Sequence, residues 1–178
     1  GMFGPTEGSW GGGAVAVDRD GSVYFVGPFS SDTLRFGTIA LPRSKPVDGF
    51  IVKFDSSGNA LWASNQSGLP GNYVQPIKIG LDRGHNAVVL DRPLSNFDTD
   101  VLRYDATGSY LWSRSFHWSS DSVCVAVGDS GVVYLARQVP PLRVVALGPG
   151  GDSLWTRTEE GLSSGVHGIA ADSRGAVH

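Results

Sequence analysis

A short phrase occurs three times along this chain of 178 residues, and the repetition limits the fold more than any other feature. Each copy joins a turn motif to a tryptophan, and the copies are Phe54–Trp62, Tyr104–Trp112 and Leu147–Trp155. Successive tryptophans lie roughly 40–50 residues apart, a spacing typical of propeller blades. The sequence therefore predicts a repeat architecture rather than an enzyme domain with a single core.

A second phrase alternates with the first and occurs four times without gaps, at Val15–Tyr24, Ile79–Val88, Val125–Tyr134 and Ile169–His178. In both phrases a run of alternating apolar residues precedes an Asp-x-x-Gly motif, and a second run follows it. This pattern is typical of two strands joined by a tight turn. The glycine supplies a positive φ and the aspartate accepts hydrogen bonds from amides of the turn, so we expect structural roles for both. The expected structural repeat residues are Asp18, Gly21, Asp55, Gly58, Trp62, Asp82, Asp105, Gly108, Trp112, Gly131, Gly151, Trp155, Asp172 and Gly175.

Two hairpins, one from each phrase, make a four-stranded antiparallel sheet, which is the blade of a β-propeller. We predict an all-β fold of three full blades and the start of a fourth, within one segment 1–178. The predicted blades are at about 13–68, 74–117, 121–160 and 166–178. The predicted strands are at about 13–18, 22–27, 49–55, 60–65, 76–82, 86–91, 99–105, 110–115, 122–128, 132–137, 142–148 and 153–158.

The ends of the repeat array are expected to stay open. With three blades and an inner hairpin, we predict an open arc rather than a closed ring, and a chain that is a piece of something longer. The first blade should have an exposed flank. The hairpin 166–178 should pack on the third blade through Ile169 and Val177.

The composition excludes several classes of function. The net charge is −3 and the charges are scattered, so the sequence carries no basic nucleic-acid footprint and no polybasic membrane patch. No apolar run approaches about 18 residues and no helical periodicity is sustained, so we expect no membrane span in this segment. The single cysteine, Cys124, lies among small apolar residues and is predicted to be a buried hydrophobic residue.

Signals for catalysis, metals and cofactors are weak. Few glutamates are available for the carboxylate pair of a glycosidase. Asp18–Gly21 is half of a calcium-binding loop, lacks the distal carboxylate, and is interpreted as an ordinary turn. His117 and His167 belong to neighbouring connectors, but no carboxylate spacing supports a shared metal. We therefore predict no catalytic residue, no metal and no cofactor in this segment.

The first repeat resembles a known family. Asp48–Ala63, together with Gly21–Ser30 and Phe36-Gly37, is similar to the bacterial β-propeller repeats called SBBP. The resemblance implies a propeller, typically in a secreted or cell-envelope bacterial protein, and it implies no activity. Later copies depart from the pattern, because His85 replaces a turn glycine and Gly148 replaces a turn aspartate. The rival repeat, of quinoprotein dehydrogenases, has a turn one residue longer.

Propeller topology predicts which face carries the ligand site. The Asp-x-x-Gly turns should project from one face, and the more variable loops and blade connectors should project from the other, where we expect function. Three connectors carry an aromatic residue that should be partly exposed and could stack on carbohydrate or accept a partner's side chain. The alternative is that each ring only fastens its connector to its own blade. The candidate ligand-binding residues are Trp10, Tyr73, Trp118, His117, Arg92 and Arg137.

These expectations lead to one functional hypothesis and two alternatives. The segment is interpreted as a non-catalytic binding or display scaffold for protein or carbohydrate, in an extracellular or cell-envelope bacterial protein. Its other expected partners are the remaining blades of the same polypeptide. The first alternative is part of a propeller enzyme, a lyase, glycosidase or quinoprotein-like protein, with catalytic residues mostly in other blades. The second is a spacer. The repeated tryptophans are interpreted as packing residues, with sugar stacking as the alternative.

Overall fold

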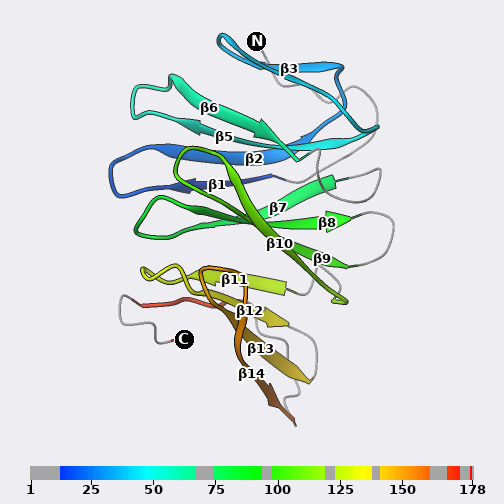
Figure 1. The fold of residues 1–178 in the computed structure, drawn as a ribbon, viewed down its shortest axis with the longest axis vertical. Helices are drawn as coiled ribbons and strands as arrows, with labels where there is room; N and C mark the ends of the chain where they lie inside the picture. The colour runs from blue at the N-terminus through cyan, green and yellow to red at the C-terminus, as the bar shows by residue number, and fades with distance from the viewer. Residues whose placement is uncertain are drawn as a thin grey trace.

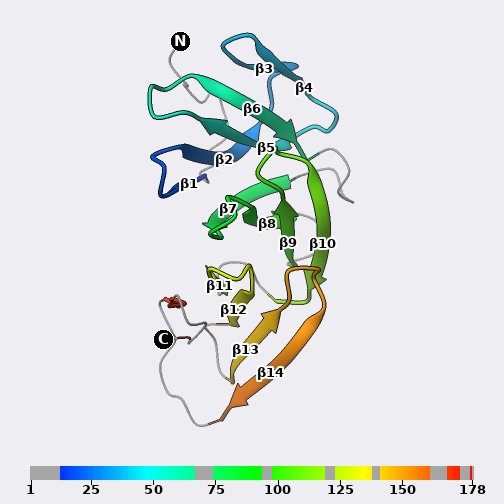
Figure 2. The same ribbon diagram turned by 60° about the vertical axis from the view of Figure 1, so that its left-hand side comes forward.

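Three four-stranded antiparallel sheets follow one another along the chain and form a segment of a β-propeller. The computed structural model describes residues 13–66, 74–93, 98–118, 123–137, 141–160, 168–172 and 177. The described residues form no helix. The sheets are stacked along the long axis of the molecule (Figure 1), and the stack curves into an open arc whose ends do not meet (Figure 2).

Each sheet contains two hairpins, as the two alternating phrases require. The first blade is β1 (Ala14–Val17), β2 (Val23–Phe29), β5 (Asp48–Phe54) and β6 (Ala60–Asn65). The second is β7 (Val74–Leu81), β8 (Ala87–Pro93), β9 (Thr99–Tyr104) and β10 (Tyr110–Phe116). The third is β11 (Val123–Val127), β12 (Val133–Arg137), β13 (Leu142–Leu147) and β14 (Ser153–Glu159). All twelve strands begin and end within two residues of the predicted positions.

The repeated aspartates make the turns as predicted. One carboxylate oxygen of Asp18 accepts hydrogen bonds from the backbone N–H groups of Asp20 and Ser22, at 3.0 and 2.9 Å, and Asp55 and Asp105 bind their own turns in the same way. The glycines that end these turns have φ between 80° and 85°. The hydrogen bonds within the turn and the positive φ therefore explain the repeated aspartate and glycine of the motif without any ligand.

A fourth, smaller sheet lies on the first blade and was not predicted. The hairpin of β3 (Thr33–Phe36) and β4 (Ile39–Pro42) turns at Gly37, where φ is 61°. Phe36 and Leu41 are buried against Phe50 and neighbouring apolar side chains. The hairpin thus covers part of the flank that was expected to be exposed, although Val15 and Val17 on β1 remain about 60% exposed.

The cores lie between the sheets. One cluster joins the first and second blades and includes Tyr24, Ile51, Val89 and Leu102, and a second joins the second and third blades. Ile169, Ala171 and Val177 pack on Ala126, Tyr134 and Ala146 of the third blade, and Ala171 forms a β-bridge with Val177. The predicted packing of the last hairpin through Ile169 and Val177 is therefore confirmed.

Candidate functional site

Repeated tryptophans join each blade to the outer turn of the next. The Trp62 indole N–H of the first blade donates to the Ala106 carbonyl of the second at 3.0 Å, and Trp112 donates to Pro149 of the third at 2.8 Å. Each ring lies on the turn glycine, because a Cβ on Gly108 would lie 2.5 Å from the Trp62 ring. The predicted packing role of these two rings is confirmed, with an added hydrogen bond across the blade boundary.

A β-bulge in each outer strand directs the tryptophan toward the next blade. The pairing of β5 with β6 passes from Phe54–Ala60 to Lys53–Trp62 and leaves Leu61 unpaired. The same shift occurs before Trp112 and before Trp155. Because an extra residue changes the face on which the next side chain lies, the bulge repeats together with the ring.

A cation on the third strand of two blades pairs with the aspartate of the inner turn. Lys53 Nζ lies 3.4 Å from Asp18 Oδ2 in the first blade, and Arg103 forms a buried ion pair with Asp82 in the second. Arg103 also donates to the Gly131 carbonyl of the third blade at 2.6 Å. The guanidinium therefore fastens the inner turn of one blade to that of the next.

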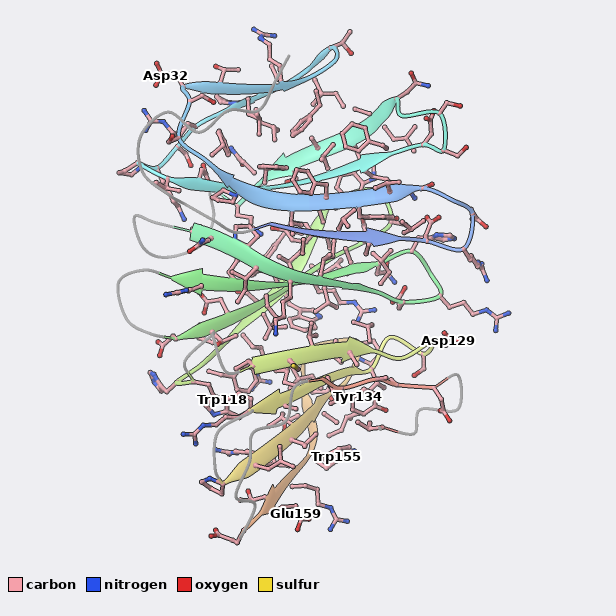
Figure 3. The ribbon with its side chains drawn as sticks, turned by 180° about the vertical axis from the view of Figure 1, so that it is seen from behind. Asp32, Trp118, Asp129, Tyr134, Trp155 and Glu159 are labelled. Atoms are coloured by element: carbon pink, nitrogen blue, oxygen red, sulfur yellow. The ribbon has the colours of Figure 1, made fainter. Side chains whose placement is uncertain are left out.

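An open cleft of about 370 Å³ lies on the face of the inner turns, where the first three blades meet. Its lining comes from β1, β7 and the turns after β1, β7 and β11, and comprises Val17, Asp18, Arg19, Leu81, Asp82, Arg83, His85 and Asp129. Figure 3 shows Asp129 at the turn end of the third blade and Trp118 toward the other end of its strands. The cleft is therefore on the face opposite to the one predicted to carry function.

His85 is the unusual residue of this cleft. It takes the place of the turn glycine and has φ 64°, and every other positive φ among the described residues belongs to glycine. Its Nδ1 lies 2.9 Å from Asp18 Oδ2 and its Nε2 lies 3.2 Å from Asp20 Oδ2, both in the first blade. A left-handed backbone conformation disfavours residues other than glycine. The presence of histidine at this position therefore points to a role for its side chain.

The carboxylate of Asp18 beside His85 is held in the charged form. Burial alone would raise the pKa of Asp18, but the backbone N–H of Ser22, the His85 ring, and further bonds from Asp20 and Lys53 together hold this pKa below its ordinary value. Asp18 is therefore negatively charged at neutral pH and faces His85. The ammonium group of Lys53, on β5, offsets this charge.

The donor atoms of Asp18, Asp20 and His85 lie within 4.8 Å of one another, a separation that a metal ion could bridge. However, the two ring nitrogens of His85 face different carboxylates, and one ion cannot bind both nitrogens of one ring. Each ring nitrogen of His85 therefore contacts one carboxylate of the first blade. The three side chains form a polar cluster across the boundary between the first two blades.

The described residues among those predicted to bind ligand on the opposite face differ in exposure. Trp118 is only 6% exposed: it packs on Phe116, and its carbonyl accepts a hydrogen bond from Thr99 at 2.8 Å. The expected exposed ring is thus wrong for Trp118, which fastens its connector to the blade. His117 is exposed and bonds to Asp98 at 2.8 Å. Arg92 and Arg137 are partly buried at the ends of β8 and β12, whereas Trp10, Tyr73, His167 and Gly175 lie outside the described residues.

A buried polar layer lies between the first two blades near that same face. Asp91 on β8 faces Asp100 across the strand pair, and Gln66 fills the space that Gly49 leaves open. Among the described residues, neither carboxylate oxygen of Asp91 and neither side-chain polar atom of Gln66 has a hydrogen-bond partner of ordinary geometry. Burial and then the charge of Asp100 raise the pKa of Asp91 far above its ordinary value, and the nearby Gln66 and Lys45 offset this only in part.

This layer predicts a loss of stability at high pH. The folded-state pKa of Asp91 is raised, so the stability linked to its proton is complete below the unfolded pKa of about 3.9 and is lost as pH rises through the folded pKa. Relative to Asp91→Asn, the melting temperature of the wild type should therefore fall as the pH rises from about 4 upward. Thermal unfolding by circular dichroism across this range is the measurement, with exposed Asp32→Asn as the control. Parallel curves for the wild type and Asp91→Asn would contradict the assignment.

The sequence contains two residues near the cleft that depart from the repeat, but they occur separately along the chain. Asp20 adds a second carboxylate to the first turn, and His85 replaces a glycine in the second turn. In the folded chain these two departures face each other across one blade boundary. A search for non-repeat residues in the inner turns of neighbouring blades would have found this pair.

Comparisons with known proteins show the fold alone. No family model matches the chain, and no curated protein matches its sequence. A solved protein of unknown function from Bacteroides caccae has a TM-score of 0.55 and 16% identity, over 97% of this chain and 54% of that one. A solved putative gluconolactonase has a TM-score of 0.45 and 15% identity, over 87% of this chain and 49% of that one. The chain thus spans about half the length of the solved structures it matches.

A search of the described residues for helices long and apolar enough to cross a membrane finds none.

Proposed function

We propose that this chain is a non-catalytic segment of a bacterial β-propeller that binds a protein ligand in the cleft on the inner-turn face. The observation that carries the proposal is His85, which keeps a side chain at a glycine position and places it beside two carboxylates at the cleft. Binding residues differ from the repeat because the repeat residues already serve the scaffold. The resemblance to SBBP repeats supports an extracellular or cell-envelope location.

The chemistry of the cleft suits a peptide better than a sugar. Arg19 and Arg83 supply exposed guanidinium groups, and Asp129 supplies an exposed carboxylate, so both signs of charge are present. Among the described residues, no tryptophan, tyrosine or phenylalanine lines the cleft, although such rings are the usual stacking surface for carbohydrate. A mixed-charge segment of a protein partner can pair with both signs, and complementary charges give such contacts their specificity.

The proposed function predicts that His85→Gly weakens binding without unfolding the chain. Glycine relieves the positive φ, which offsets the lost contacts to Asp18 and Asp20, so we expect stability within about 1 kcal/mol of the wild type. The affinity for mixed-charge peptides should fall about tenfold, as it should in Arg83→Ser. Fluorescence anisotropy with labelled peptides of mixed, neutral and single-sign charge provides the measurement.

The matched control is Arg35→Ser, which removes an exposed arginine on β3 outside the cleft lining. Its affinity should equal that of the wild type. A glycan array is probed with the same protein. Unchanged peptide affinity in both cleft variants, or glycan binding that His85→Gly abolishes, would overturn the assignment of a protein ligand.

A further inference from the structure

The contact between the second and third blades uses two side chains of one outer strand. Trp112 donates from its indole N–H to the Pro149 carbonyl at 2.8 Å, and Arg114 Nη1 donates to the Gly151 carbonyl at 2.5 Å. Gly151 is required beneath the ring, because a Cβ there would lie 2.9 Å from the nearest ring carbon of Trp112. A turn that presents two carbonyls around a left-handed glycine is therefore the partner of this pair.

The third blade carries the same pair, and among the described residues no turn lies against it. Trp155 and Arg157 occupy the positions of Trp112 and Arg114 in the repeat, and the preceding bulge is also present. Trp155 is 41% exposed, and its described ring contact is with Tyr134 of its own blade, at 6.1 Å between centroids. Figure 3 shows Trp155 and Tyr134 close together near the end of the stack. In the described part of the chain, no carbonyl accepts a hydrogen bond from this indole or from Arg157.

We propose that Trp155 and Arg157 form a docking surface for a β-hairpin of the same repeat, the outer hairpin of the blade that residues 168–177 begin. The Trp155 indole N–H would donate to the carbonyl of the second turn residue, and Arg157 would donate to the carbonyl of the turn glycine. This surface is separate from the cleft of His85 and does not depend on the function proposed for it.

The existing contacts favour this occupant over a second copy of the chain. Ile169 and Val177 already cover the inner half of this face of the third blade, so the partner has to fit the outer half alone. The first blade of another copy is a complete four-stranded sheet and would overlap these residues. Its flank is also partly covered by the β3–β4 hairpin, through Phe36 and Leu41. An outer hairpin without its own inner strands satisfies both constraints.

The test extends the full chain with a copy of its own repeat. Because His178 aligns with Tyr134, a copy of residues 135–160 is joined directly after His178, with serine in place of the copied tryptophan. Hydrogen exchange of the Trp155 indole N–H is followed by NMR, and the resonance is assigned by its loss in Trp155→Phe. We expect exchange to slow at least tenfold relative to the unextended chain and the appended strands to become protected.

The control extension carries valine in place of the glycine copied from Gly151, whose Cβ would meet the ring. This extension should leave the indole exchange as fast as in the unextended chain. The proposal is overturned if the first extension gives no protection, if its appended residues stay unprotected, or if the valine extension protects equally. Protection that rises with the concentration of the unextended chain, with a dimer in light scattering, would identify a second copy as the occupant and would also overturn it.

Discussion

Replacing Arg103 by alanine is expected to lower the free energy of unfolding by about 3–5 kcal/mol, the usual cost of removing one partner of a buried ion pair. The side chains of Arg103 and Asp82 are 3% and 4% exposed, so the substitution would leave a buried carboxylate without its cation. It would also remove the donor to Gly131 of the next blade. Urea unfolding followed by circular dichroism and tryptophan fluorescence measures the change.

The third blade suggests the matched control. At the positions of Asp82 and Arg103 it has Gly128 and Ala146, so this blade lacks both charges. The double variant Arg103→Ala with Asp82→Gly should therefore recover more than half of the lost free energy, since replacing both partners removes the uncompensated charge. If the double variant is as unstable as the single one, the uncompensated charge does not dominate the loss, which then comes from the Arg103 side-chain volume, its bond to Gly131 or the turn bonds of Asp82.

Replacing Trp112 by alanine is expected to cost about 2–4 kcal/mol. The value lies somewhat below the usual 3–5 kcal/mol for a fully buried tryptophan, since the ring is only partly buried. The loss combines the stacking on Gly151 and the hydrogen bond to Pro149, both of which join the second blade to the third. The melting temperature should fall by about 4–16 °C for a chain of this size.

Trp155→Ala is the control for this prediction, since the same residue type occupies the same repeat position, is 41% exposed and has no turn against it in the part of the chain that the structure describes. We expect it to cost less than about 1 kcal/mol. Equal losses in the two variants would show that the ring stabilises its own blade, through contacts such as that with Tyr134, and not the boundary with the next blade.

Most of the fold could be predicted because the same pattern of strands and turns occurs several times in the sequence. Val125–Tyr134 and Ile169–His178 carry the same alternation and turn letters, so errors in one copy are corrected by the others. The β3–β4 hairpin was missed because it occurs once, although Leu34, Phe36, Ile39 and Leu41 alternate around Gly37. The other repeats are shorter and have no counterpart of this segment, so it was interpreted as a loop.

The cleft lies on the face opposite to the one where the sequence predicted function, for a related reason. Variable loops were taken to mark function, and Trp118 was chosen as an exposed ring, but apolar neighbours such as Phe116 bury it. The cleft instead lies among the turns, whose regular motif had been assigned to structure alone. The two departures from that motif, Asp20 and His85, are far apart in the sequence and showed no relation there.

The sequence by itself determined the strands, the turns and the succession of blades, because alternating apolar residues and turn-forming aspartates and glycines act over a few residues. Only the tertiary structure decided which side chains meet across a blade boundary. Arg103 reaches Gly131, Trp112 reaches Pro149, and His85 reaches Asp20 because neighbouring sheets stack with matched registers and a bulge directs each tryptophan. Such contacts depend on the distance and rotation between whole sheets, and no local pattern of residues encodes those quantities.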